Sequence, residues 1–253
     1  MKIDLSKKCV LVTGGSSGIG LAIAKRAREA GAKVAVMSRR GDLLEKTAAE
    51  IGAVALPGDV RSRTDAEAVV AACVAQMGGL TTLVNSAGVI GSGDTAGTAP
   101  EEWERIMGIN VDGTVNLCRA ALGPLKRAGA AASILNVSSV ARYRPFAGVT
   151  AYCVSKAAIE MYTKCLALEL APSGVRVNAI APGVVVTNLH TVTNAVPDYE
   201  AFLARSRETH PLGFVGEPDD AAWMALYLCS DQARWVTGTV MPLDGGRGCL
   251  SAR

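Results

Sequence analysis

Short apolar runs rich in valine and isoleucine alternate with longer, alanine-rich segments along this chain. The apolar runs predict strands at residues 8–13, 33–38, 53–57, 81–86, 133–138, 175–180 and 239–243. The segments between them predict helices at residues 18–30, 41–50, 64–77, 151–171 and 218–230, with one further helix from residue 100 and another that ends at about 127. The strands are continuously apolar rather than alternating, as expected of a parallel sheet covered on both faces. The pattern therefore indicates an α/β protein of about seven strands, either an open, doubly wound sheet with helices on both faces or a closed barrel.

No linker, low-complexity tract or repeat interrupts this alternation, so residues 1–253 are expected to form a single domain. One segment, residues 187–215, breaks the rhythm with Pro197, Pro211 and Gly213. A long excursion after the end of a strand is typical of a segment that covers a binding site. We therefore expect residues 187–215 to act as a lid over a substrate.

Composition fits this architecture and excludes several function classes. Hydrophobic residues make up 49% of the 253 positions but aromatic residues only 4%, so Ala, Val, Leu and Ile must build the core. The net charge is +3 and there is no basic run, so nucleic acid is not an expected partner. No apolar stretch approaches the ~20 residues of a membrane span, so no membrane is expected either.

Cysteine and histidine contribute little candidate chemistry. The seven cysteines are scattered and never form a C-x-x-C pair, which favours buried free thiols in a reducing, cytoplasmic compartment. His190 and His210 are the only histidines, so neither a metal site nor a Ser-His-Asp triad is expected. The candidate chemistry must lie in other residue types.

A glycine-rich loop, residues 13–20, joins the first predicted strand to the first predicted helix and reads Thr-Gly-Gly-Ser-Ser-Gly-Ile-Gly. Glycine permits positive φ, close approach of the backbone to a pyrophosphate and close packing of the helix on the strand. The N–H groups and the dipole of the helix N-terminus can then bind phosphates. This context predicts a dinucleotide site on an open, Rossmann-type sheet rather than a barrel. The loop residues expected to hold the cofactor are Gly14, Ser16, Ser17, Gly18, Ile19 and Gly20.

The end of the second predicted strand bears on the choice between NAD and NADP. An acidic residue there hydrogen-bonds the ribose 2′-hydroxyl of NAD and repels the 2′-phosphate of NADP. This chain instead has Ser38, Arg39 and Arg40, and the nearest acid, Asp42, lies in the following turn. Arg39 offers a planar guanidinium suited to a phosphate. We therefore expect NADP(H) to be favoured over NAD(H); the alternative is that both arginines are merely solvated at a helix start.

Tyr152 and Lys156 form a Y-x-x-x-K pair, whose members share one face of a predicted helix. A tyrosine can give a proton to the alkoxide that forms when a hydride reduces a ketone, but its ordinary pKa is ~10. A lysine one turn away and an oxidised nicotinamide both favour the phenolate, which lowers that pKa toward neutrality. Ser139, just past the fifth predicted strand, is expected to hydrogen-bond and orient a substrate carbonyl.

Together these motifs resemble those of the short-chain dehydrogenase/reductase family, and the resemblance runs over the whole chain. The spacing G-x-x-x-G-x-G after Thr13 is typical of that family, as is a serine 13 residues before the tyrosine, which selects Ser139 rather than Ser138. The segment at residues 85–88, Asn-Ser-Ala-Gly, is similar to the family's N-N-A-G segment, with Ser86 in place of the second asparagine.

The resemblance implies roles for further residues. Asn110 is expected to complete an Asn-Ser-Tyr-Lys tetrad by holding a water in a proton relay to Lys156, which would also bind the nicotinamide ribose. Asp59 and Val60 match the family's adenine-contacting pair, and residues 182–187 match its segment beside the nicotinamide. The residues that the resemblance adds to the cofactor site are Asp59, Val60, Asn85, Ala87, Gly88, Tyr152, Lys156, Pro182, Gly183, Val185 and Thr187.

The resemblance implies an oxidoreductase that transfers a hydride between NADP(H) and a small-molecule carbonyl or secondary alcohol. It is similar to the 3-oxoacyl-carrier-protein reductases and the carbonyl, sugar and steroid reductases of the compact, single-domain branch. An NAD-dependent alcohol dehydrogenase and a catalytically silent NADP-binding regulator remain alternatives. The resemblance also implies a homotetramer, or a homodimer, formed through long helices near residues 110–126 and 151–171 and through the C-terminal segment.

An apolar or mixed substrate pocket is expected around the catalytic residues. Its candidate residues are 89–92, 140–144 and 184–186, together with Leu189, Val192, Val196, Tyr199 and Phe202 of the expected lid.

Overall fold

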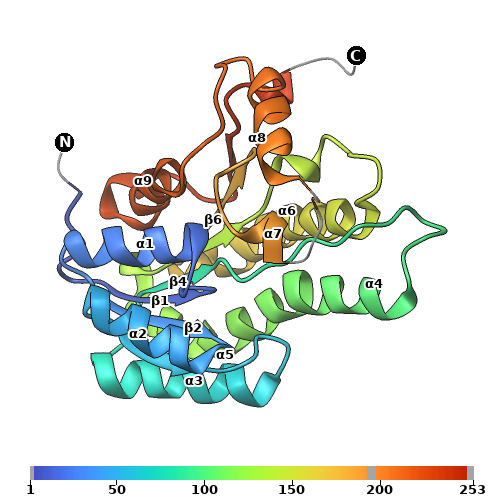
Figure 1. Cartoon of the computed structure of the whole chain (residues 1–253). Helices are drawn as coiled ribbons and strands as arrows, with labels where there is room; N and C mark the ends of the chain where they lie inside the picture. Colours follow the sequence, from blue (N-terminus) through green and yellow to red (C-terminus); the bar gives the residue numbers. More distant parts are fainter. Residues whose placement is uncertain (1–2, 193–195, 197, 250–253) are drawn as a thin grey trace.

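The computed structural model describes residues 3–192, 196 and 198–249, and within these residues seven parallel strands form one central sheet (Figure 1). The strands are β1 (Cys9–Thr13), β2 (Lys33–Ser38), β3 (Val54–Pro57), β4 (Thr82–Asn85), β5 (Ser133–Val137), β6 (Arg176–Pro182) and β7 (Val240–Leu243). Their spatial order is β3-β2-β1-β4-β5-β6-β7, and every neighbouring pair is parallel. The order reverses between β1 and β4, so the predicted open, doubly wound sheet is confirmed.

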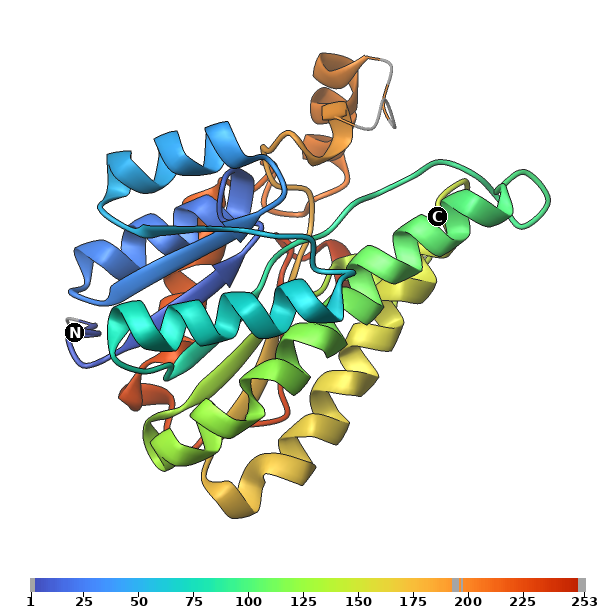
Figure 2. The same cartoon turned by 90° about the horizontal axis from the view of Figure 1, so that it is seen from below.

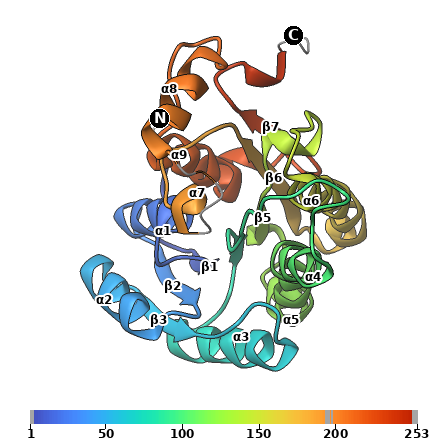
Figure 3. The same ribbon diagram turned by 45° about the vertical axis from the view of Figure 1, so that its right-hand side comes forward.

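Helices cover both faces of the sheet (Figure 3). On one face lie α1 (Gly18–Glu29), α2 (Gly41–Ile51) and α9 (Pro218–Cys229). On the other lie α3 (Arg63–Met77), α5 (Gly113–Ala128) and α6 (Thr150–Leu170). The chain enters α5 from α4 (Pro100–Met107), and together these two helices run alongside α6 (Figure 2). Two further short helices, α7 (Leu189–Val192) and α8 (Tyr199–Glu208), lie between β6 and α9.

The core consists of two apolar layers, one on each face of the sheet. Along β1, Val10 and Val12 face one layer and Leu11 faces the other, and all three are at most 2% exposed. Where α1 meets α9, Ala24 and Ala225 are fully buried, which lets the two helices approach closely. The core thus contains small and aliphatic side chains in place of aromatic ones, and these allow helices and sheet to pack closely.

The structure departs from the sequence prediction in three places. The sixth strand extends to Pro182 rather than ending near residue 180, and it is buried throughout. Between the two helices predicted over residues 100 to about 127 lies a π-helical turn, Gly108–Asp112, that the sequence did not predict. The cysteines are not uniformly buried, because Cys165 and Cys249 are exposed. None of the described helices combines the length and the apolar composition needed to cross a bilayer.

Buried His210 ties the end of α8 to the chain just after β6. The backbone N–H of Val184 donates to His210 Nε2 at 3.2 Å, so the Nδ1 of this ring carries the proton and donates to the Ser206 carbonyl at 2.6 Å. The imidazole is only 3% exposed, and a side chain at Gly183 would lie 2.7 Å from its Nε2. Both ring nitrogens are therefore used, and the neutral tautomer is built into the fold.

The charges around His210 oppose its protonation. Burial lowers its pKa below the ordinary 6.5, and the cations Arg247 and Arg144 lower it further. The Ser206 carbonyl and the Asp244 carboxylate act in the opposite direction but do not reverse the shift. A protonated ring could no longer accept the Val184 N–H, so protonation would break this hydrogen bond between the end of α8 and the chain after β6.

A pH-dependent loss of stability follows from this neutral histidine. Because its pKa is lower in the folded chain, the unfolded chain takes up the proton first as the pH falls below 6.5, and folding is weakened there. We expect the parent chain to lose about 1 kcal/mol more unfolding free energy between pH 7 and pH 5 than His210→Gln, whose amide oxygen can still accept the Val184 N–H. Denaturant titrations at each pH measure this, and His190 stays common to both chains. Parallel stability curves would contradict it.

Candidate functional site

A cavity of about 580 Å³ opens at the carboxyl ends of the strands, and most of the predicted site residues line it. It lies where the strand order reverses, which is where open α/β sheets bind ligands. The predicted residues that line it are Gly14, Ser16, Ser17, Gly18, Ile19, Gly20, Ser38, Arg39, Arg40, Asp59, Val60, Ala87, Gly88, Ser139, Tyr152, Lys156, Pro182, Gly183, Val185 and Thr187. Two predicted residues, Asn85 and Asn110, are not part of this lining.

The loop between β1 and α1 has the geometry of a phosphate cradle. Gly14 and Gly18 have φ angles of 66° and 55°, a region that side chains disfavour. A Cβ on Gly14 would lie 2.9 Å from the Ala87 Cα, and one on Gly20 would lie 2.4 Å from the Gly14 carbonyl oxygen. Ser17 makes no side-chain capping bond at the start of α1, and the first turn of that helix contains no acidic residue. The N-terminus of α1 can therefore receive an anion.

The end of β2 offers unused polar groups next to this cradle. The Ser38 hydroxyl oxygen is buried but has no hydrogen-bond partner. Arg39 is exposed and close enough to Asp59 to lower the pKa of that carboxyl, although Arg61 has the larger effect. Arg40 Nη2 lies 3.5 Å from the Ser17 hydroxyl. An orphaned hydroxyl, two cations and an uncapped helix N-terminus fit the ribose and phosphates of a nicotinamide dinucleotide.

Ser139, Tyr152 and Lys156 meet where β5 ends and α6 begins. The Ser139 hydroxyl accepts the Ala141 N–H at 3.2 Å and also hydrogen-bonds Tyr152. Lys156 Nζ donates to the Val137 carbonyl at 2.9 Å and lies 5.6 Å from the centre of the Tyr152 ring. The one-turn spacing on α6 therefore places both side chains as the sequence predicted, at the same end of the cavity as Ser139.

Burial dominates the electrostatics of this group. It raises the pKa of Tyr152 to about 12, and the hydrogen bond from Ser139 opposes this only in part. It also lowers the pKa of Lys156 to about 8. Lys156 alone therefore does not lower the pKa of Tyr152; the expectation also counted the charge of an oxidised nicotinamide. The reason is desolvation, together with a lysine whose ammonium is directed to the Val137 carbonyl rather than to the phenol oxygen.

Asn110 lies in the π-helical turn between α4 and α5, a type of distortion that often marks functional sites. Its Nδ2 donates to the Val89 carbonyl at 3.0 Å and to Ser155 Oγ at 2.9 Å, and its Oδ1 accepts the Val89 N–H at 2.9 Å. A Cβ on Gly88 would lie 3.4 Å from Asn110 Oδ1 and 3.5 Å from Lys156 Nζ. Asn110 therefore sits behind the lining, close to Lys156, and joins the strand β4 exit to α6.

Asn85 points into the sheet rather than into the cavity. Its Nδ2 donates to Asn136 Oδ1 at 2.9 Å and lies 3.3 Å from Cys118 Sγ. The side chain is 4% exposed, and its Oδ1 has no hydrogen-bond partner. In this structure the Asn85 side chain links β4 to β5.

The remaining part of the cavity is mostly apolar. Of the predicted pocket residues it contains Val89, Ile90, Val140, Ala141, Val184, Val185, Leu189, Val196 and Phe202. The predicted residues that do not line it are Gly91, Ser92, Arg142, Tyr143, Arg144, Val186 and Tyr199, and the side chain of Val192 lies outside the described part of the structure. The lining residues that sequence reasoning missed include Phe146, Ala147, Val149, His190 and Arg247. Residues 146–149 lie just before Tyr152 in the chain, and this proximity could have indicated that they line the cavity. No local sequence pattern indicates that Arg247 does.

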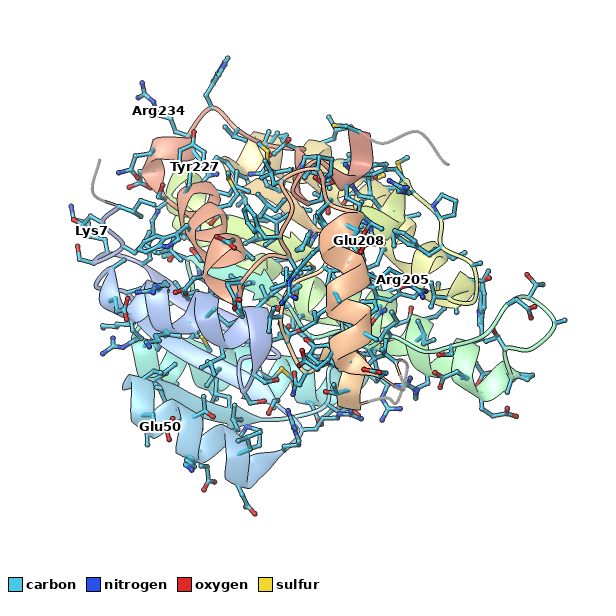
Figure 4. The ribbon with its side chains drawn as sticks, turned by 45° about the horizontal axis from the view of Figure 1, so that its top comes forward. Lys7, Glu50, Arg205, Glu208, Tyr227 and Arg234 are labelled. Atoms are coloured by element: carbon cyan, nitrogen blue, oxygen red, sulfur yellow. The ribbon has the colours of Figure 1, made fainter. Side chains whose placement is uncertain are left out.

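Helix α8 lies over one side of this apolar region. Leu203 packs with Val184 and Val215, while Phe202 reaches the cavity. Arg205 and Glu208 lie on the opposite, exposed side of the helix (Figure 4). Part of the expected lid, residues 193–195 and 197, lies outside the described residues. No cluster of three or more His, Cys, Asp or Glu suited to a metal ion occurs in the part of the chain that the structure describes.

Comparison with known proteins identifies the family. The sequence model described as enoyl-(acyl carrier protein) reductase matches residues 14–247. The chain is 38% identical over 247 residues to 2,5-dichloro-2,5-cyclohexadiene-1,4-diol dehydrogenase LinX of Sphingobium indicum, which covers 96% of each chain. It is 36% identical over 248 residues to the NADP-dependent (R)-specific alcohol dehydrogenase of Lentilactobacillus kefiri, which covers 96% of this chain and 97% of that one.

A solved structure agrees with these relatives. The 3-ketoacyl-(acyl-carrier-protein) reductase from Brucella melitensis, complexed with NADH, superposes with a TM-score of 0.88 at 37% identity and covers 95% of this chain and 98% of its own. The chain thus belongs to the short-chain dehydrogenase/reductase family, as an oxidoreductase acting on CH–OH or C=O groups.

Proposed function

We propose that this chain transfers a hydride between NADP(H) and a carbonyl or secondary alcohol, with Tyr152 as the general acid and base. The observation that carries the proposal is the meeting of Ser139, Tyr152 and Lys156 on the same cavity as the glycine-rich loop. One cavity can therefore hold both a dinucleotide and the group that it reduces or oxidises. The cofactor residues predicted from the sequence are retained in this proposal, with the Asn85 side chain acting from inside the sheet.

The protein's own residues handle the proton and the orientation of the substrate. A bound nicotinamide supplies or accepts the hydride. The Ser139 hydroxyl donates a hydrogen bond to the substrate oxygen, and the Tyr152 hydroxyl gives a proton to that oxygen in reduction and takes one in oxidation. Lys156 Nζ lies 5.6 Å from the centre of the Tyr152 ring, and its charge together with that of an oxidised nicotinamide is proposed to favour the phenolate against the burial that raises the pKa of Tyr152. Asn110 holds the segment around Val89 against α6 and lies next to Lys156, where a proton relay would begin.

Removing the phenolic oxygen tests the assignment. Tyr152→Phe should lower kcat for ketone reduction by at least ~10³-fold, because the alkoxide loses its proton donor, while cofactor binding is nearly unchanged. Stopped-flow measurement of NADPH oxidation, with cofactor affinity from fluorescence titration, gives both quantities. Tyr227→Phe, on α9 and away from the cavity, is the matched control. Hydride transfer at near the parental rate in Tyr152→Phe would disprove the assignment.

The buried Lys156 should cost stability in the chain without cofactor. Burial lowers its pKa from 10.5 to about 8, so at pH 7 the folded chain carries a charge that it disfavours relative to the unfolded chain. We expect Lys156→Met to raise the unfolding free energy by about 1–3 kcal/mol at pH 7, after allowing for the lost bond to Val137, while activity is abolished. The gap should close between pH 8 and pH 10.5, because the folded parent is then neutral while its unfolded form is still protonated. Urea titrations measure it, and a variant less stable than the parent at pH 7 would contradict it.

The preference for NADP(H) is proposed from the end of β2. An acidic residue at this position would repel the 2′-phosphate of NADP, but this chain has Ser38, whose hydroxyl has no hydrogen-bond partner. The next residue, Arg39, is exposed. The relatives do not decide the matter, because one is named NADP-dependent and another was solved with NADH. An NAD-dependent alcohol dehydrogenase on the same scaffold is therefore the competing proposal.

Introducing the missing acid separates the two cofactors. Ser38→Asp should raise the KM for NADPH by about tenfold or more through repulsion of the 2′-phosphate and should lower the KM for NADH. Steady-state kinetics with both cofactors measures this. Ala49→Asp, which adds the same charge on the exposed side of α2, is the control. A parent chain that uses NADH better than NADPH would overturn the preference.

A catalytically silent NADP-binding regulator is less well supported. A regulator needs the glycine-rich loop but has no need of a buried tyrosine hydrogen-bonded to a serine beside a buried lysine. The same oxidation assay with a panel of ketones distinguishes it, since a regulator would bind NADPH without oxidising it.

Assembly and location are proposed together. Val154, Met161 and Leu168 lie seven residues apart on α6 and are 41%, 59% and 79% exposed, which forms an apolar stripe. Trp223 on α9 and Trp235 beyond it are 52% and 97% exposed. These faces support the homotetramer implied by the family, or a homodimer, which light scattering would measure.

The free cysteines support a cytoplasmic, reducing environment. Residues 187–215 are proposed as the lid over the substrate.

A further inference from the structure

Arg247 belongs to the cavity although it follows the last strand of the sheet. It begins a short turn after β7, and that turn lies beside the end of α8 in Figures 1 and 3. Cβ atoms on Gly245 and Gly246 would lie 3.4 Å from His210 and 3.2 Å from Pro211, which fixes this neighbourhood. From there the Arg247 guanidinium lines the cavity, 4.7 Å over the ring of Phe146.

The charge of Arg247 has no counter-ion among the residues that the structure describes. Its Nε is buried without a hydrogen-bond partner. The Asp244 carboxylate acts on Arg247 only through its charge, and it already accepts the Tyr143 hydroxyl at 2.9 Å and the N–H groups of Gly246 and Gly248 at 3.0 and 2.8 Å. Arg144 donates to the Arg247 carbonyl, so it adds a second positive charge nearby. A partly buried cation left in this state costs free energy unless a ligand supplies the missing acceptor.

The surroundings define the shape of such a ligand. Between the catalytic residues and Arg247 the lining is apolar, with Phe146, Val149, Leu189 and Phe202. His190 lies there too. Burial and the charge of Arg247 lower its pKa, so its imidazole is neutral and carries no charge that would bind or repel an anion. A guanidinium presents its N–H donors in one plane, which matches the two oxygens of a carboxylate. The cavity thus combines a proton donor, an apolar stretch and a cation that can bind a carboxylate.

We infer that Arg247 binds a carboxylate of the substrate, so that the chain acts on oxo acids and the corresponding hydroxy acids whose carboxylate is separated from the reacting carbon by an apolar spacer. This inference rests on the proposed function and names its substrate class. In reduction, hydride adds to the carbonyl carbon and the Tyr152 proton adds to its oxygen, which gives the hydroxy acid. The carboxylate is unchanged and serves only as the handle that Arg247 holds.

Matched substrate pairs test the inference by kinetics. A series of straight-chain oxo carboxylic acids is compared with their methyl esters, which keep the ketone and the spacer but remove the charge. For the best chain length we expect kcat/KM to be at least ~10²-fold higher for the acid than for its ester. Arg247→Gln should lose that factor on the acid and keep the ester within about threefold, and Arg247→Lys should recover part of it. Arg205→Gln, on the exposed side of α8, should leave the preference unchanged.

Equal use of acid and ester by the parent chain would overturn the inference, and so would equal losses on both in Arg247→Gln, which would mean a structural role. Calorimetry provides a readout that needs no turnover. Saturated carboxylates of four to eight carbons, added with oxidised cofactor, should bind the parent at least tenfold more tightly than their methyl esters and lose this in Arg247→Gln. If these compounds bind so but no ketone is reduced, the proposed function fails while the carboxylate site stands. If ketones are reduced without any preference for the acid, the site fails alone.

Discussion

The whole cofactor side of the molecule depends on one close approach, at the end of β1. The Thr13 hydroxyl oxygen is buried and accepts the backbone N–H groups of both Ser86 and Ala87 at 3.1 Å, so the exit of β4 is clamped to the exit of β1. On the other side, the Gly14 N–H donates to the Met37 carbonyl of β2 at 2.8 Å. The three strand ends are therefore held level at the place where the strand order reverses. No side chain fits at Gly14, because Ala87 already occupies the space, so the clamp also explains the glycine.

A second constraint fixes the catalytic helix. Asn85 on β4 donates to Asn136 on β5, and Asn136 donates to the Thr163 hydroxyl on α6, each at 2.9 Å and each with buried partners. Buried polar groups are more stable with partners, so this chain of bonds favours one rotation of α6 about its axis. The two adjacent serines after β5 have different partners. The Ser138 hydroxyl donates to the Lys156 carbonyl and so links β5 to α6. Ser139 is left facing the cavity beside Tyr152.

What could be predicted from the sequence was local. Continuous apolar runs and the glycine-rich turn predicted the parallel sheet and the cradle, since each depends on a few neighbouring residues. The one-turn spacing predicted that Tyr152 and Lys156 share a helix face, and both line the cavity. The inward turn of Asn85, the π-helical setting of Asn110 and the position of Arg247 depend on contacts between distant segments, which no local pattern encodes. Spacing could not predict the pKa of Tyr152 either. It gives the distance to a cation but not the desolvation that raises the pKa to about 12.

The distribution of charge around the cavity connects these observations. Arg39, Arg40, Lys156 and Arg247 all line it, and the N-terminus of α1 adds a partial positive charge. Among the described lining residues Asp59 is the one acid, and it is paired with Arg61. A cleft lined by one sign of charge concentrates ligands of the opposite sign and speeds their arrival. The net charge of +3 does not reveal this arrangement, because acidic residues elsewhere in the chain offset most of the basic residues. The cavity is thus poorly satisfied in the free chain, and both a dinucleotide and an anionic substrate would supply the acceptors that its cations lack.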